Sequence, residues 1–145
     1  MKIRWRFRYR RTNVLGAVER MDVTPLVPQG SQIIESYGNG GFRVSGIIFT
    51  GAMIVFPDRS IEWPGADFDA LSLEMLAPIF GVEDPPEILL LGCGRGARLI
   101  NSTLRAAIRA RGLVLDAMDT GAACRTYNIL MTEERRVVAA LLPVD

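Results

Sequence analysis

Residues 89–100 read LLLGCGRGARLI, an apolar run that leads into Gly92, Gly94 and Gly96. Loops that hold a phosphate or a methyl donor begin in this way, because glycine lets the backbone approach a ligand closely. Such a site also needs an acidic residue after the next strand, and Asp116 and Asp119 meet this need by position. The stretch therefore raises the question of a nucleotide site.

The expected helix start argues against a nucleotide site. Asn101, Ser102 and Thr103 form a capping cluster, so we expect the helix to begin there, too late for its amides to point into the glycine loop. The chain after Gly96 is also too short for the rest of a typical dehydrogenase or methyltransferase sheet. We interpret the glycines as a tight exit from a buried strand and expect no cofactor.

Composition excludes several kinds of catalytic site. The sequence contains no histidine, and Cys93 and Cys124 are its only cysteines. A zinc site of the usual Cys and His kind cannot form within one chain, and Ser-His and Cys-His catalysis are excluded. We assign no catalytic residue and no metal ligand. Whether the protein is an enzyme stays open, and a non-enzymatic role is favoured.

A strand-helix-strand crossover over residues 87–119 would bring polar groups together at one sheet edge, because parallel strands end on the same side. The candidate crevice there consists of Gly92, Cys93, Gly94, Arg95, Asp119, Thr120, Cys124 and Arg125. A thiol near a helix N-terminus and an arginine would have a lowered pKa and raised reactivity. The alternative, which we favour, is that both thiols pack as small apolar side chains.

The helix after Asp119 carries a second candidate surface. Arg125, Asn128 and Thr132 share one helix face at spacings of three and four. That face is a solvated surface, an anchor for the preceding loop or a contact site for a partner, and the sequence does not separate these. With Thr120 as the helix cap, we expect Arg125 to reach back to Asp119 and Asn128 to bond the loop after the glycine-rich strand.

The elements that must position these residues follow from hydrophobic spacing and turn residues. Phe42 to Ser45 is expected to be the first strand, after a turn at Asn39 to Gly41, and residues 42–63 form antiparallel strands. A short or kinked helix is predicted over 69–80, and a linker over 81–86. The remaining elements are strands over 88–91, 113–118 and 137–142 and helices over 102–111 and 120–133. Together they predict a three-layer α/β domain.

The N-terminus differs in charge from the rest of the chain. Residues 1–20 hold seven basic residues against Glu19 alone, and the opening MKIRWRFRYRR alternates arginine with apolar or aromatic side chains. An extended strand of this kind could bind single-stranded nucleic acid or an anionic membrane surface. We favour a basic tail over 1–20 outside a single α/β domain over 21–145. No apolar stretch approaches the roughly 20 residues of a membrane span, so we expect a cytoplasmic protein.

Three motifs together resemble a known family: SYGNGGFRVSG, LLLGCGRG and DTGAACRTYNILMTEERRVVAALLP, the last at residues 119–143. They are similar to the small α/β family of the third mitochondrial assembly factor of respiratory complex I and its uncharacterised bacterial relatives, over about residues 33–143. The matching positions are Gly38, Gly40, Gly41, Phe42, Gly46, Gly51, Pro57, Trp63, Gly92, Gly94, Asp119, Thr120, Ala123, Arg125, Thr126, Asn128, Glu133, Arg135 and Pro143.

The resemblance implies a fold and a mode of action. It implies a three-layer arrangement around a mixed sheet of about five strands with one antiparallel strand. The residue pattern itself places an antiparallel β segment first and a strand-helix-strand-helix-strand segment after it. The family's glycine loop is not an established nucleotide site, and its mitochondrial member acts through protein partners. Two features depart from the family: the arginine-rich residues 1–20, and Glu134, which stands where the family tends to have glycine at a tight helix exit.

These observations favour a non-enzymatic accessory protein that acts through protein contacts, with a respiratory complex as the expected setting. The alternative is a small-molecule-binding protein or minor enzyme that uses the crevice between the glycine loop at 92–96 and the helix start at 119–124. Nucleic acid or an anionic membrane would be a partner only if the basic tail is functional. The oligomeric state is left open.

Overall fold

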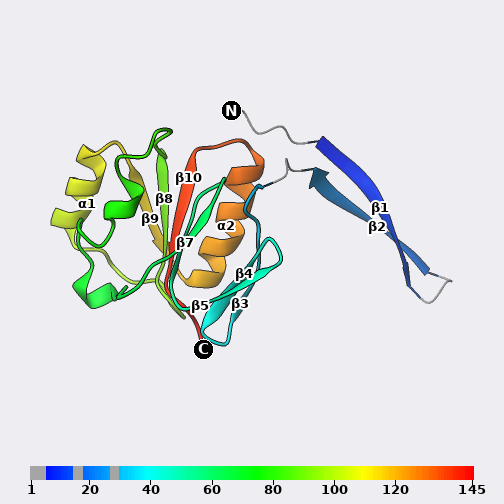
Figure 1. The fold of residues 1–145 in the computed structure, drawn as a ribbon, viewed down its shortest axis with the longest axis horizontal. Coiled ribbons are helices and arrows are strands. Elements are labelled where there is room, and N and C mark those ends of the chain that lie inside the picture. The colour runs from blue at the N-terminus through cyan, green and yellow to red at the C-terminus, as the bar shows by residue number, and fades with distance from the viewer. Residues whose placement is uncertain (1–5, 15–17, 27–29) are drawn as a thin grey trace.

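The computed structural model describes residues 6–14, 18–26 and 30–145 (Figure 1). At its centre is a five-stranded sheet in the order β7-β6-β10-β8-β9. The strands are β6 (Met53–Val55), β7 (Ser60–Glu62), β8 (Ile88–Gly92), β9 (Val114–Met118) and β10 (Val137–Leu141). β8, β9 and β10 run parallel, and β6 runs antiparallel to both β10 and β7. This is the mixed sheet with one antiparallel strand that the resemblance implied.

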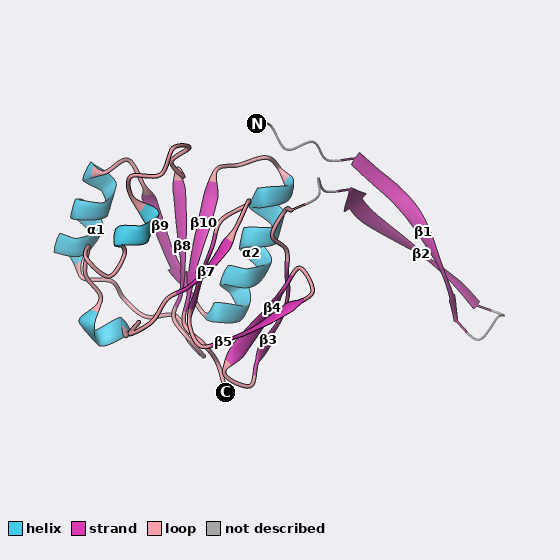
Figure 2. Cartoon of the chain, in the orientation of Figure 1, coloured by secondary structure: helices cyan, strands magenta, loops and turns pink. Residues whose placement is uncertain are grey.

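Two helices cover opposite faces of this sheet, α1 (Ser102–Ala110) and α2 (Thr120–Thr132), as Figure 2 shows. The central strand β10 is buried on both faces, which explains its continuous apolar sequence. Val137, Ala139 and Leu141 belong to the core under α2, whereas Val138 and Ala140 belong to the core under α1. The alternation of strand side chains thus builds two apolar cores and the expected three layers.

A second, smaller sheet packs against α2. It contains β3 (Ile34–Gly38), β4 (Gly41–Val44) and β5 (Ile47–Thr50) in antiparallel order. Ile34, Phe42 and Val44 contribute to the same core as Tyr127 of α2. The buried Tyr127 hydroxyl lies 2.9 Å from the Gln32 carbonyl oxygen and 3.0 Å from that of Phe56, and burial raises its pKa. The antiparallel strands predicted within residues 42–63 are confirmed.

The expectation that Phe42 to Ser45 is the first strand of the body was wrong, because β3 precedes it. Ile34 is the only fully buried residue of β3, and the strand shows no apolar alternation that would reveal it in the sequence. Its backbone pairing with β4 and its contact with α2 make it a strand.

The helix predicted over residues 69–80 was also wrong. The segment contains two short 3₁₀ turns, η1 (Phe68–Ala70) and η2 (Ala77–Ile79). Pro78 stands at the start of η2, where its missing N–H costs little, whereas inside an α-helix it would remove a hydrogen bond and clash with the preceding turn. Trp63 Nε1 also donates to the Met75 carbonyl oxygen at 2.8 Å, which gives that oxygen a partner outside any helix.

The other predicted elements are confirmed within one or two residues at their ends. α1 begins at Ser102 because Asn101 Oδ1 accepts the N–H groups of Thr103 and Leu104, and the chain turns at Gly112 with a φ of 88°. Ile108 of α1 is buried, as the spacing indicated, and Arg105 and Arg109 are exposed.

The N-terminal region contains β1 (Arg6–Val14) and β2 (Val18–Leu26), which pair antiparallel and stand apart from the body in Figure 1. β2 includes residue 20, at which the sequence predicts a division between a basic tail and the α/β domain. This division remains a prediction. The first residues of the alternating basic and aromatic stretch, 1–5, lie outside the described residues. Within the described ranges, no helix is long and apolar enough to cross a membrane.

Candidate functional site

The glycine loop, residues 92–96, lies directly against the first turn of α2. A Cβ atom at Gly92 would come within 3.0 Å of both Leu141 Cδ2 and Thr120 Oγ1, so only glycine fits there without displacement of its neighbours. Gly94 has a φ of 89°, a conformation that side chains other than glycine rarely adopt. Gly92 therefore allows the strand end to approach α2 closely, and Gly94 allows the chain to turn. Both roles agree with the interpretation of a tight exit from a buried strand.

Hydrogen bonds join this loop to the start of α2 and to the end of β10. The Gly94 N–H donates to Thr120 Oγ1 at 2.9 Å, and the Thr120 N–H donates to the Gly94 carbonyl oxygen at 2.8 Å. The Thr120 hydroxyl in turn donates to the Leu142 carbonyl oxygen at 2.7 Å, and the Leu142 N–H donates to the Gly92 carbonyl oxygen at 3.0 Å. These groups are thus paired within the protein, whereas a phosphate loop needs backbone N–H groups that point at the ligand.

The N-cap of α2 is Asp119 rather than Thr120, which corrects the sequence-based assignment. The Asp119 carboxylate accepts the Ala122 N–H at 2.9 Å. Thr120 is fully buried and uses its hydroxyl to join the glycine loop to the end of β10. Both residue types are good N-caps, so the sequence could not separate them.

The two cysteines lie in separate apolar cores. Cys93 belongs to the core under α1 and Cys124 to the core under α2, so the sheet separates their surroundings. Burial raises the pKa of the Cys93 thiol and raises that of Cys124 to about 12. A raised pKa keeps each thiol protonated near neutral pH, opposite to the activation that a helix N-terminus and an arginine could have given. Both thiols pack as small apolar side chains, the alternative that the sequence favoured.

The remaining residues of the candidate crevice have separate surroundings. Arg95 and Arg125 are exposed, and Asp119 is half-buried. The structure thus joins Gly92, Gly94 and Thr120 in one hydrogen-bonded corner, next to the Asp119 carboxylate that caps α2. The use of this corner as a ligand site remains a prediction.

On the second candidate surface, Asn128 holds β3 in place. Its Oδ1 accepts the Ile34 N–H at 3.0 Å, and its Nδ2 donates to the Ile34 carbonyl oxygen at 2.8 Å. From the sequence, Asn128 was expected to bond the loop after the glycine-rich strand. That expectation was wrong, because Asn128 bonds the backbone of β3. The Thr132 hydroxyl donates to the Asn128 carbonyl oxygen at 2.6 Å. Two of the three side chains on this face are therefore engaged inside the protein.

Arg125, the third member of that face, does not pair with Asp119 among the described ion pairs, so the expected contact between them was wrong. Arg125 lies beside Gly121 instead. A Cβ atom added at Gly121 would come within 3.3 Å of Arg125 Nη1 and within 2.3 Å of the Tyr37 hydroxyl oxygen. Gly121 thus provides a bare backbone surface for Tyr37 of β3. Sequence reasoning missed this contact, although the glycine in the first helix turn is an available signal.

Glu134 forms the exit of α2 in a left-handed conformation, with a φ of 61°. The Glu134 N–H donates to the Met131 carbonyl oxygen and the Arg135 N–H to that of Leu130, both at 3.0 Å. The tight helix exit is therefore present although a glutamate occupies the position at which the family tends to have glycine.

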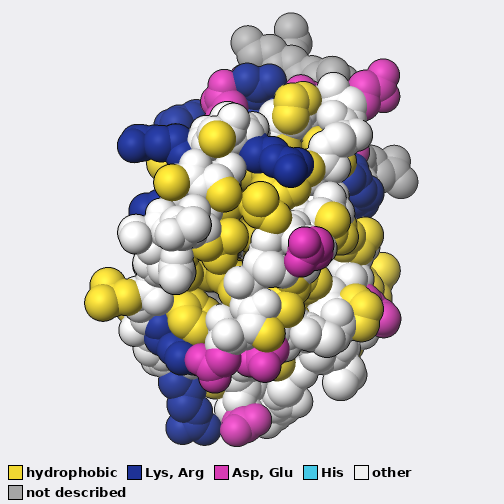
Figure 3. Space-filling model, turned by 90° about the vertical axis from the view of Figure 1, so that its left-hand side faces the viewer, with side chains coloured by type: hydrophobic (Ala, Val, Ile, Leu, Met, Phe, Trp, Pro, Cys, Tyr) yellow, Lys and Arg dark blue, Asp and Glu magenta, His cyan; other side chains and the backbone are white. Residues whose placement is uncertain are grey.

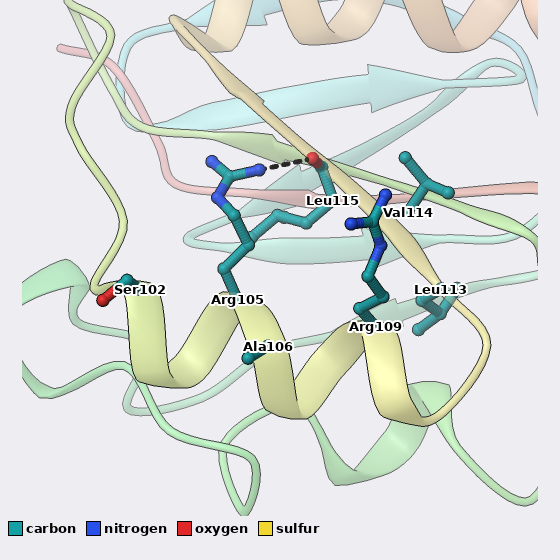
Figure 4. Close-up of a pocket in the computed structure, with 7 residues that line it drawn as sticks. All are labelled: Ser102, Arg105, Ala106, Arg109, Leu113, Val114 and Leu115. Atoms are coloured by element: carbon teal, nitrogen blue, oxygen red, sulfur yellow. Dashed lines mark hydrogen bonds between the residues drawn. The ribbon is translucent and has the colours of Figure 1, made fainter.

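A groove between α1 and the edge strand β9 was not anticipated (Figure 4). It encloses about 380 Å³ and is lined by Ser102, Arg105, Ala106, Arg109, Leu113, Val114 and Leu115. Arg105 Nη1 donates to the Leu115 carbonyl oxygen at 2.9 Å. The sequence indicated only that both arginines face outward from the helix, which is the usual position of a solvated side chain.

A wider hollow of about 760 Å³ lies between residues 68–74 and 99–107. Figure 3, which views the molecule from the side on which α1 lies in Figure 1, shows hydrophobic side chains gathered at the middle of this face, with charged side chains around them. Leu99, at the rim, is 96% exposed, and Arg98 stacks on Phe68 and pairs with Asp69 at 2.7 Å.

The mixed sheet, the two covering helices and the glycine loop bonded to α2 together define a small α/β domain. A family model described as "Protein of unknown function (DUF498/DUF598)" matches residues 34–142, and the chain belongs to this family.

Known proteins and structures agree with this assignment. An uncharacterised protein of Rhodobacter capsulatus is 35% identical over 117 residues, which cover 79% of this chain and 87% of that protein. NADH dehydrogenase (ubiquinone) 1 alpha subcomplex assembly factor 3 of Danio rerio is 31% identical over 111 residues, 77% of this chain and 64% of that protein. The solution structure of a Bordetella pertussis protein described as a Mth938-like domain has a TM-score of 0.67 at 33% identity and covers 80% of this chain and 88% of that one.

Proposed function

We propose that this protein is a non-enzymatic accessory factor that acts through protein contacts in the assembly of a respiratory complex. Relatives of this family in animals carry the name of a NADH dehydrogenase assembly factor, and this chain spans 64% of the one from Danio rerio. We propose the same kind of activity, assistance in the assembly of a respiratory complex, for the present chain. The part of the two proteins that aligns supports this proposal.

The geometry of the glycine loop is the single observation that carries the non-enzymatic part. The Gly94 N–H donates to the Thr120 hydroxyl oxygen and the Thr120 N–H donates to the Gly94 carbonyl oxygen, so the protein's own helix occupies these groups of the loop most typical of a cofactor site. The nearby thiols of Cys93 and Cys124 have raised pKa values, which leaves them poor nucleophiles near neutral pH. These features support a structural role for this corner.

The test is purification of the tagged protein from its native host at its natural level, after chemical cross-linking, with mass spectrometry of what is retained. The expected result is a stoichiometric set of protein partners that includes subunits of a respiratory complex. Deletion of the gene should lower the amount of that complex on native gels, and restoring the gene should restore it. We also propose that the protein is cytoplasmic, and cell fractionation tests this location.

Two outcomes would contradict the proposal. One is purification without any specific protein partner and with an unchanged respiratory complex in the deletion strain. The other is a small molecule that co-purifies and whose binding is lost on substitution of Arg95 or Asp119, which would favour the candidate crevice as a ligand site.

A further inference from the structure

The edge strand β9 has backbone groups beside the groove that pair with no other strand among the described residues. Among the described residues β9 pairs only with β8. The Val114 N–H donates to the Glu87 carbonyl oxygen at 2.9 Å, so the backbone groups of Val114 face the sheet. Because N–H and C=O groups of successive strand residues point to opposite sides, those of Leu115 and Ala117 face away from the sheet. This edge is open to the addition of another strand.

One of these outward groups is held by an arginine. Arg105 Nη1 donates to the Leu115 carbonyl oxygen at 2.9 Å, as the dashed line in Figure 4 marks. A guanidinium has five N–H donors, so this single bond leaves Arg105 able to bind an anion as well. Arg105 therefore caps the sheet edge in the free protein.

The groove also carries an excess of positive charge. Arg109 lies one helix turn after Arg105 and extends over the same groove, and no described ion pair involves it. None of the residues that line the groove is acidic. Asp116 is on β9, but it alternates with Leu115 and so faces the opposite side of the sheet.

The spacing of the two arginines suits an extended chain. Residues four apart on a helix are separated by about 6 Å along the axis. Alternate residues of a β-strand repeat every ~6.6 Å and point to the same face. A strand added to the β9 edge would therefore present side chains at two alternate positions to Arg105 and Arg109, beside the apolar side chain of Leu115.

We infer that the groove between α1 and β9 binds an extended acidic segment of a protein partner, which adds to β9 as a further strand and places two carboxylates, at alternate positions, beside Arg105 and Arg109. A backbone N–H of the segment takes over the Leu115 carbonyl oxygen, and the released Arg105 guanidinium pairs with a carboxylate. The inference rests on the proposed function, since it names the surface through which protein contacts are made.

Synthetic peptides test this directly by fluorescence anisotropy with the full chain. The probe is an eight-residue labelled peptide of alternating glutamate and valine, and the controls are a lysine-valine peptide and an isomer with all four glutamates at one end. The alternating acidic peptide should bind at least tenfold more tightly than either control, and binding should weaken with added salt. Equal binding of the two acidic isomers, or no binding, would overturn the inference.

N-methylated versions of the peptide test strand addition. Residues that share a strand face also share the direction of their N–H groups, so methylation of all glutamate nitrogens and of all valine nitrogens removes different sets of donors. One set should abolish binding and the other should leave it nearly unchanged. Equal tolerance of both, or equal loss with both, contradicts addition to the β9 edge.

Charge reversal in the protein identifies the surface. Arg109→Glu should weaken binding of the alternating acidic peptide at least tenfold, whereas the matched control Arg125→Glu, on the other side of the sheet, should leave it unchanged. Both arginines are exposed, so neither change should unfold the protein. The reverse pattern would move the binding surface to α2 and overturn the inference.

The outcome for the groove is separable from the outcome for the proposed function. If the native-host purification yields partners that Arg109→Glu retains in full, the groove is not the contact surface although the accessory role stands. If the purification yields no specific partner, the proposed function fails, whatever the peptides do.

Discussion

Gly94 and Thr120 bond each other in both directions, since the Gly94 N–H donates to Thr120 Oγ1 and the Thr120 N–H donates to the Gly94 carbonyl oxygen. The same Thr120 hydroxyl donates to the Leu142 carbonyl oxygen, so one side chain joins the ends of β8 and β10 to the start of α2. Three elements from separate parts of the chain thus meet at one buried hydroxyl.

Replacement of this hydroxyl should be costly. Thr120→Val keeps the shape of the side chain but leaves the Gly94 N–H and the Leu142 carbonyl oxygen without their partner, which should lower the free energy of unfolding by about 2–3 kcal/mol. Urea denaturation measures it. The control Thr126→Val removes only a long contact to Met118 Sδ and should cost much less. An equal effect of the two changes would contradict the role assigned to Thr120.

Asn128 should contribute to stability, and Arg125 should not. Asn128→Ala removes both hydrogen bonds to the Ile34 backbone and should lower the free energy of unfolding by about 1–3 kcal/mol. Arg125 is exposed, so Arg125→Ala should change it by less than about 0.5 kcal/mol. Denaturant unfolding of the two variants beside the wild type decides this. A large loss at Arg125 would show that its contact beside Gly121 and Tyr37 holds β3.

The thiol of Cys124 should make stability depend on pH in the alkaline range. Burial raises its pKa to about 12 in the folded state, whereas an unfolded chain ionises near the ordinary value for cysteine, roughly 8.5. The stabilisation is therefore fully present below that ordinary value and is lost progressively as the pH rises toward the folded pKa.

The measurement is the free energy of unfolding between pH 8 and 10 for the wild type and for Cys124→Ala, which cannot ionise at this position. The wild type should lose stability more steeply than the variant over this range. Thiol reagents should also modify Cys124 slowly in the folded protein and quickly in urea. Parallel pH profiles of the two proteins would show that the thiol is not protected.

The left-handed conformation of Glu134 should be strained. A residue with a side chain pays roughly 1–2 kcal/mol to adopt this conformation, and glycine avoids most of this cost. Glycine, however, destabilises the folded state by about 0.5–1 kcal/mol, because the unfolded chain has more conformational freedom at a glycine. Glu134→Gly should therefore leave stability unchanged or raise it by up to about 1 kcal/mol. At the preceding Glu133, where φ is −85°, the same substitution relieves no strain and should destabilise. Thermal unfolding compares the two, and a greater loss at Glu134 would contradict this account.

The sequence by itself determined most of the second half of the fold. Residues after 87 alternate apolar runs with amphipathic stretches, and local residues mark their ends, as Asn101 and Gly112 do for α1. Chain length and connection then required a parallel crossover between β8 and β9. These features depend on neighbours within a few residues, so a single sequence is sufficient to predict them.

Only the tertiary structure decided what the candidate residues do. Asn128 could bond many backbone groups, and its actual partner, Ile34, is 94 residues away in the chain. The opposite placement of Cys93 and Cys124 depends on which face of the sheet each segment covers, and the groove beside Arg105 depends on β9 being an edge strand. Each of these properties arises from contacts between distant segments, because burial, pairing and charge environment are set by what packs nearby in space rather than by neighbours in sequence.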